Sequence, residues 1–200
     1  MNVRQLQVVV AVLGAAAALG PMAAAHIETS PDGNSVTAEG LRGMLLGSND
    51  LPGFQTTQCP RVVTSAAEWA RNDRAAIGEL RTEGFVMGVR ESLRSRTGQS
   101  TADSEAVHFR TAAGAGREVV RQVAGARTMG LRRRFAVPAI PAGQGYSLVT
   151  DGGMSYHVVF SVRSDEYAVA LAVPPGAALS DSRGEAEVIA AAAGILARTS

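Results

Sequence analysis

The C-terminal quarter of the chain carries the pattern that most constrains the fold. Every second residue is apolar in two neighbouring runs, first Met154, Tyr156, Val158, Phe160 and Val162, then Tyr167, Val169, Leu171 and Val173. Alternation with a period of two is typical of strands that bury one face. The polar Ser164-Asp165-Glu166 between the runs predicts a hairpin turn. Pro174-Pro175-Gly176 ends the second strand, because proline cannot donate to a β-ladder.

A helix is predicted after this hairpin, and the same order of elements occurs earlier in the chain. The helix spans about Asp181 to Arg198 and places its apolar side chains on one stripe, namely Val188, Ile189, Ala192, Ile195 and Leu196. Upstream, Ile77 to Leu93 predicts a strand, Arg94 to Asp103 a polar loop, Glu105 to Thr111 a second strand, and Ala112 to Arg127 a helix. We therefore expect two β-β-α repeats.

These elements predict an α+β domain. An antiparallel sheet that joins both hairpins, with the helices packed on one face, would bury the apolar stripes in a single interior. Leu131 to Val137 and Tyr146 to Thr150 predict further strands between the two repeats. The expected organisation is a signal peptide at residues 1–25, a disordered lead-in at 26–36 and one domain at 37–200.

The N-terminus has the features of a secretory signal peptide. Arg4 precedes an uncharged run from Val8 to Leu19, and small residues ending at Ala25 predict cleavage before His26. The run is shorter than the roughly 20 residues that a membrane-spanning helix needs. We therefore expect a secreted, extracytoplasmic protein with no stable membrane span after cleavage; an uncleaved N-terminal anchor is the alternative.

Composition narrows the range of partners. Loss of Arg4 on cleavage leaves 18 arginines against 18 acidic residues, and aromatic residues make up only 4% of the chain. A neutral balance with few stacking side chains predicts no nucleic-acid partner. The single cysteine, Cys59, cannot form an internal disulfide, so it is either a buried apolar residue or an intermolecular partner.

No sequence motif predicts catalysis, a metal or a cofactor. The chain has no lysine to complete a P-loop, no G-x-S-x-G and no zinc-ligand spacing. His108 and His157 lie in predicted strands opposite the apolar residues, which indicates exposed histidines; alternatively, the two repeats bring them together as a metal or acid–base pair. Enzymatic activity is left open, and the missing catalytic motifs favour a protein that is not an enzyme.

The densest charge run is Arg132-Arg133-Arg134. In an alternating strand Arg132 and Arg134 share a face and Arg133 points the other way. Such a run is either a solvated sheet edge or a contact for an anionic ligand or envelope polymer. Arg132, Arg134, His108 and His157 are therefore the candidate ligand-binding residues.

Several turns and strand ends resemble those of a known group of exported proteins. They are the turn from Asn49 to Phe54, Val107-His108-Phe109 before an Ala-Gly-rich helix, and Val137 to Ala142 before a Gly-Tyr strand. The chain resembles exported actinobacterial proteins, namely LpqN-type lipoproteins with a PsbP-like fold and extracellular sensor domains of PknH-type kinases. The resemblance covers roughly residues 40–198 and implies a sheet with packed helices and no shared catalytic residues. The lipid-acceptor cysteine and the paired cysteines of those groups are absent here.

These observations lead to one main functional hypothesis and two alternatives. The main hypothesis is a secreted, non-catalytic binding or sensing module of the bacterial cell envelope, with a lipid, a glycan or an envelope protein as its partner. One alternative is a small secreted hydrolase whose site is assembled from separate strands. The other is a protein-interaction partner of an envelope complex.

Overall fold

A computed structural model describes residues 36–47, 49–177 and 179–199. In this structure an eight-stranded antiparallel sheet forms the centre of the protein. The strand order is β1-β3-β4-β8-β7-β6-β5, with β2 also paired to β3. The strands are β1 (Phe54–Thr56), β2 (Arg61–Val63), β3 (Phe85–Ser95), β4 (Thr101–Phe109), β5 (Leu131–Phe135), β6 (Gln144–Thr150), β7 (Gly153–Val162) and β8 (Asp165–Val173). The predicted α+β antiparallel architecture is confirmed. The signal peptide and nearly all of the lead-in lie outside the described residues.

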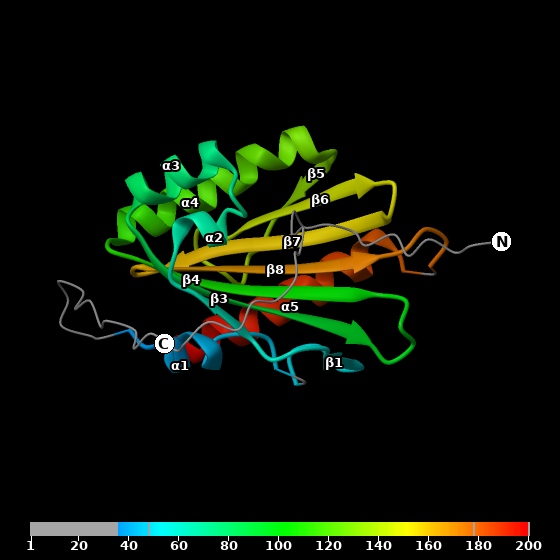
Figure 1. Ribbon diagram of the computed structural model, residues 1–200. Coiled ribbons are helices and arrows are strands. Elements are labelled where there is room, and N and C mark those ends of the chain that lie inside the picture. Colours follow the sequence, from blue (N-terminus) through cyan, green and yellow to red (C-terminus); the bar gives the residue numbers. More distant parts are fainter. Residues whose placement is uncertain (1–35, 48, 178, 200) are drawn as a thin grey trace.

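Helices cover both faces of this sheet (Figure 1). They are α1 (Ala38–Gly43), α2 (Ala66–Trp69), α3 (Arg74–Glu83), α4 (Ala112–Gly125), which continues into the 3₁₀ turn η1 (Ala126–Met129), and α5 (Asp181–Arg198). Along β7, Tyr156 and Val158 pack with Ile195 of α5, whereas Val159 packs with Val119 of α4. Successive residues of a strand point to opposite faces, so α4 and α5 lie on opposite sides of the sheet. The prediction that the helices share one face is wrong.

The order strand, strand, helix does occur twice, but the two units are not copies of one arrangement. Strands β4 and β8 are antiparallel neighbours at the middle of the sheet. A two-fold axis normal to the sheet relates such neighbours, and this axis would place α4 and α5 on the same face. Because they lie on opposite faces, the two units differ in their three-dimensional arrangement.

Helix α3 replaces the first half of a predicted strand. The sequence predicts one strand from Ile77 to Leu93, but Asp73 caps a helix there by accepting hydrogen bonds from the backbone N–H groups of Ala75 (2.9 Å) and Ala76 (3.3 Å). Gly84, in the left-handed region at φ 85°, ends this helix. Strand β3 then begins at the next residue. A strong cap and a glycine stop therefore outweigh an ambiguous apolar spacing.

The C-terminal hairpin and helix follow the sequence pattern closely. Strands β7 and β8 are joined by Arg163 and Ser164, one residue earlier than expected, with Arg163 in the left-handed region at φ 54°. Helix α5 has the predicted bounds, and its residues Val188, Ala192 and Ile195 are fully buried in the main core. None of the helices in the described part of the chain is long and apolar enough to cross a membrane.

Candidate functional site

The two faces of the sheet differ in polarity. The side chains facing α5 form one large apolar core, whereas the side facing α4 holds two small apolar clusters with polar residues between them. In the strand register, Asp103 and Glu105 of β4 lie on that side opposite Ala170 and Ala168 of β8. The polar interior beneath α2, α3 and α4 is therefore the part of the molecule that calls for a functional explanation.

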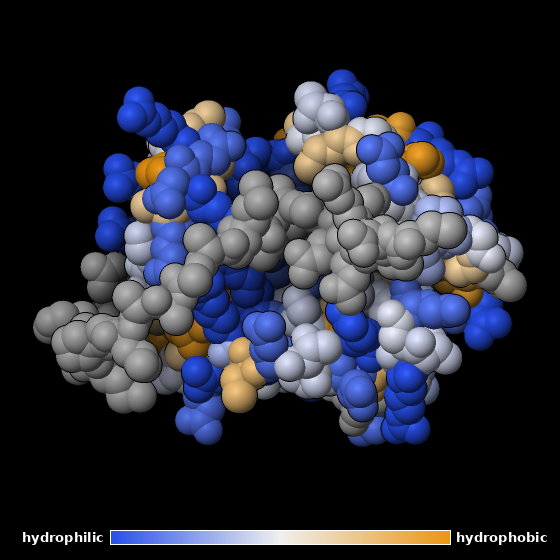
Figure 2. Space-filling model, turned by 45° about the vertical axis from the view of Figure 1, so that its right-hand side comes forward, coloured by the Kyte–Doolittle hydropathy of each residue, from blue (hydrophilic) through white to orange (hydrophobic). Residues whose placement is uncertain are grey.

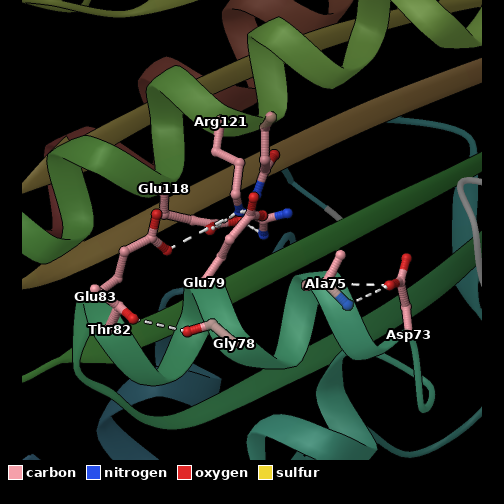
Figure 3. Close-up of polar contacts among 10 residues, drawn as sticks. Asp73, Ala75, Gly78, Glu79, Thr82, Glu83, Glu118 and Arg121 are labelled. Atoms are coloured by element: carbon pink, nitrogen blue, oxygen red, sulfur yellow. Dashed lines mark hydrogen bonds and ion pairs between the residues drawn. The ribbon is translucent and has the colours of Figure 1, made fainter.

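Acidic side chains from three elements meet beneath α4 in what we call the carboxylate cluster, Glu83, Glu118 and Glu166 with Arg121 and Gln122. Figure 3 shows Glu83, Glu118 and Arg121 of this cluster. Arg121 Nε donates to Glu118 Oε2 at 2.7 Å and lies 4.0 Å from Glu83 Oε2. Gln122 Nε2 donates to Glu118 Oε1 at 3.2 Å and to Glu166 Oε1 at 3.0 Å. This network ties α3 and α4 to strand β8.

The carboxylate cluster holds more acid than its one arginine can neutralise. Glu83, Glu118 and Glu166 are all buried, and Oε2 of Glu83 and of Glu166 has no hydrogen-bond partner among the described residues. Burial, with a hydrogen bond to Glu118, raises the pKa of Glu83 to about 7. Burial also raises the pKa of Glu166 well above its ordinary value. The cluster therefore binds protons in a pH range where ordinary glutamates are ionised.

A second group lies nearer the β3 side of the same face, around the arginine pair, Arg71 and Arg90. Both terminal nitrogens of Arg71 are buried, and the described part of the chain offers them no hydrogen-bond partner. Burial, together with the positive charge of Arg90, lowers the pKa of Arg71 to about 10. The Arg90 guanidinium lies 4.8 Å from the centroid of the Trp69 ring, at cation–π distance.

Two carboxyl groups on β4 neighbour the arginine pair. Ser92 Oγ donates to Asp103 Oδ1 at 2.5 Å, and burial raises the pKa of Asp103. Burial also raises the pKa of Glu105 to about 7, against the opposing effect of the charge on Arg90. Glu105 therefore neutralises the arginine pair incompletely near neutral pH.

Both predicted histidines are buried, with 4% exposure for His108 and 7% for His157, because each face of the sheet is covered. His108 faces α5, and its Nδ1 lies 2.7 Å from Asp165 Oδ1. His157 faces α4, with Nε2 2.9 Å from Ser155 Oγ, and burial lowers its pKa to about 4. The expectation of exposed histidines is wrong.

The two histidines are not brought together either. His108 is opposite Asp165 of β8, whereas His157 is opposite Ala170. Five residues of strand correspond to about 17 Å, and the two side chains point to opposite faces. The alternative of a metal or acid–base pair is therefore wrong, and no group of His, Cys, Asp and Glu suited to a metal is found in the described ranges. Ligand contact by either histidine stays a prediction.

The arginine run has a structural contact that the sequence did not reveal. Arg132 binds Asp181 at the start of α5 with both terminal nitrogens, at 3.1 and 2.9 Å, and Arg133 pairs with Glu185 of the same helix. The register shifts between Leu131 and Arg133, so the simple alternation expected for Arg132 and Arg134 does not hold. Arg134 is exposed on edge strand β5. Ligand binding by Arg132 and Arg134 stays a prediction.

Sequence reasoning missed the carboxylate cluster and the arginine pair, although two signals were present. Glu105 alternates in phase with the apolar Val107 and Phe109, so it had to share their buried face. Glu118 lies three residues after Ala115 and one before Val119, on the buried stripe of α4. Arg71 gave no such signal because it follows a four-residue helix in a turn. Cys59 is exposed, so the alternative of a buried apolar residue is wrong, and an intermolecular disulfide stays a prediction.

Comparison with known proteins identifies a similar fold but gives no information on catalytic or binding residues. No protein-family model matches the sequence, and no curated protein shows significant similarity to it. The structure is similar to the crystal structure of the extracellular domain of PknH from Mycobacterium tuberculosis, with a TM-score of 0.56 and 10% sequence identity. The match covers 81% of this chain and 97% of that chain. The PknH-like fold implied by the sequence resemblance is therefore shown, whereas LpqN-type relatives and an actinobacterial source stay predictions.

Proposed function

We propose that this protein is a secreted, non-catalytic binding or sensing module of the bacterial cell envelope. The observation that carries the proposal is the fold, which matches an extracellular domain across nearly its whole length. The features of a signal peptide before His26 support the same location. A module of this kind holds a ligand and reports it through shape or partner contacts, without making or breaking bonds.

The α4-facing side of the sheet supports binding as the activity. Polar and charged groups gather there whose hydrogen-bonding capacity the described residues leave partly unused, in Arg71, Glu83 and Glu166. Burying such groups is costly, and natural proteins keep them mainly where function requires them. Figure 2 shows the molecule hollowed near the middle of one face, with hydrophilic side chains gathered in the hollow. A polar ligand suits this surface better than an apolar one.

One observation favours the hydrolase alternative, namely the Ser155–His157 contact at 2.9 Å. A serine nucleophile needs a base that a third group orients, and no carboxylate hydrogen-bonds His157 in the described part of the chain. Ser155 is only 2% exposed, which keeps a substrate carbonyl from its Oγ. The pair is better explained as a satisfied polar contact within the sheet.

Large exposed apolar residues give little support to a protein-interaction surface. Val120, Val149 and Met129 are exposed at 68, 51 and 44%, and they lie on α4, β6 and η1. Single exposed apolar residues are normal for a monomer, whereas docking faces are contiguous patches.

Native mass spectrometry of the protein purified from its own culture medium tests the proposal. We expect a mature chain that begins at His26 and carries a non-covalent adduct that leaves on collisional activation. A ligand-free chain that hydrolyses members of an ester, amide and glycoside panel would instead establish the hydrolase. A chain that begins before Val8 would contradict cleavage of the signal peptide.

A further inference from the structure

We propose that Arg71 and Arg90 form a binding site for a small ligand that carries a carboxylate or phosphate group. The inference rests on the proposed function and deepens it by naming the chemistry of the ligand and the residues that hold it. The site lies on the α4-facing side of the sheet, where Trp69 at the end of α2 packs against Gly88 and Arg90 of strand β3.

The unused donors of Arg71 are the first part of the argument. Its two terminal nitrogens are buried, and no hydrogen bond or ion pair to them is found among residues 36–47, 49–177 and 179–199. A guanidinium presents its N–H groups as a rigid fork that matches the two oxygens of a carboxylate or phosphate. Buried donors of a charged group that stay unpaired are costly, and a bound anion would satisfy them.

Other arginines of the protein differ from Arg71 because their terminal nitrogens bind carboxylates. Arg61 is the register partner of Arg90, and it binds Glu68 at 2.6 Å. Arg121 and Arg132 each bind a carboxylate through two nitrogens. Arginines with a structural role are thus paired here, whereas Arg71 is not.

Arg90 supplies a second positive charge from a fixed position. Its guanidinium is held at the Trp69 ring, which packs in turn against Gly88, where a Cβ atom would lie 2.5 Å from the indole. A guanidinium held on an aromatic ring in this way keeps N–H groups free at its edge. Arg71 follows Trp69 by two residues, so its backbone lies close to the ring that holds Arg90. The positive charge of Arg90 also acts on Arg71 and opposes its own positive charge.

Asp103 and Glu105 do not replace the proposed anion. Both attract Arg71, but neither forms an ion pair with it within the described residues, and Asp103 accepts its hydrogen bond from Ser92. Arg71 and Asn72 also adopt left-handed backbone conformations, with φ at 52° and 66°. Non-glycine residues are rarely found there, and such strain is concentrated at ligand-binding sites.

Thermal unfolding of the mature protein in chloride, inorganic phosphate and glucuronate at equal ionic strength tests the site. We expect phosphate or glucuronate to raise the Tm of the wild type relative to chloride, because a ligand that binds only the folded state stabilises it. The apparent Kd from this shift should increase at least tenfold in R71Q and R90Q. The control R74Q, an exposed arginine three residues from Arg71, should keep the wild-type response.

The baseline in chloride separates a ligand site from a structural role. R71Q should unfold at or above the wild-type temperature, because the substitution removes an unpaired buried charge. A lower Tm of R71Q in chloride would indicate an internal partner and overturn the inference. The inference would also be overturned if an anion raised the Tm of wild type, R71Q and R90Q by the same amount, or if neither anion changed the Tm of the wild type. If neither anion binds while native mass spectrometry still finds an adduct, this inference fails and the proposed binding function stands.

Discussion

Replacement of Glu83 by glutamine should change how the stability of the protein depends on pH. Glu83 is 8% exposed, and its Oε2 lies 4.0 Å from Arg121 Nε and has no hydrogen-bond partner within the ranges that the structure describes. Burial raises its pKa from 4.5 to about 7. The folded protein therefore keeps this proton between about pH 4.5 and 7, where the unfolded chain has lost it.

The sign and size of the effect follow from this difference. Where the folded state binds more protons than the unfolded state, the free energy of unfolding falls as the pH rises. One pKa unit corresponds to about 1.4 kcal/mol, so a shift from 4.5 to about 7 lowers the stability of the wild type by about 3 kcal/mol. This contribution to stability is complete below about pH 4.5 and is lost by about pH 7. The neutral amide that E83Q introduces does not titrate in this range, so the variant loses this dependence.

Urea unfolding at pH 5, 6, 7 and 8, followed by the fluorescence of the single tryptophan Trp69, measures the effect. The stability of E83Q relative to wild type should rise by about 2 kcal/mol in total between pH 5 and 7, roughly 1 kcal/mol per pH unit. The control is E79Q, since Glu79 lies 3.6 Å from the same Arg121 with its side chain 55% exposed; its curve should run parallel to wild type. Parallel curves for E83Q and wild type would refute the argument that burial in the carboxylate cluster holds this proton.

Three further substitutions around α5, with G116A in α4 as a control, are tested by chemical denaturation. G184A should lose about 2 kcal/mol, because a Cβ atom there would overlap the Tyr156 ring, whereas G116A, with open space around it, should be neutral or slightly stabilising. I195A should lose about 3 kcal/mol, because the side chain is fully buried in the main core; a loss below about 1 kcal/mol would mean that the helix is not docked. D181A removes the contacts to Arg132 of β5 and to the Tyr156 hydroxyl. The free energy of unfolding should fall by about 1 kcal/mol at this partly exposed site, and by less in high salt.

Much of the secondary structure could be predicted because its signals are local. Thr37 caps α1 by accepting from the N–H of Gly40 at 3.0 Å, and Thr111 caps α4 in the same way at 3.1 Å. The alternation in β7 and β8 and the stripe of α5 predicted those elements almost residue by residue. The prediction failed at α3, where one apolar run suits a helix and a strand equally well.

The candidate site was much less predictable, because its residues come from separate parts of the sequence. Glu83, Glu118 and Glu166 lie on α3, α4 and β8, and the contact between α4 and β8 joins residues 44 positions apart. Surface glutamates are common, so their burial becomes visible only when the helices are docked. Arg90 likewise reaches the Trp69 ring, two residues before Arg71, only because α2 packs on β3.

By itself the sequence determined which residues share a face in the regular strands β7 and β8 and which residues form the apolar stripe of α5, since both patterns depend on chain geometry over a few residues. Only the tertiary structure decided how the strands align with one another. The apolar Val107 and Phe109 of β4 point toward α4, whereas Val158 and Phe160 of β7 point toward α5. The phase of one strand carries no information about the phase of its neighbours, because pairing and register set that relation. The helices consequently cover both faces, and this places the histidines apart and encloses the acids and arginines of the candidate site.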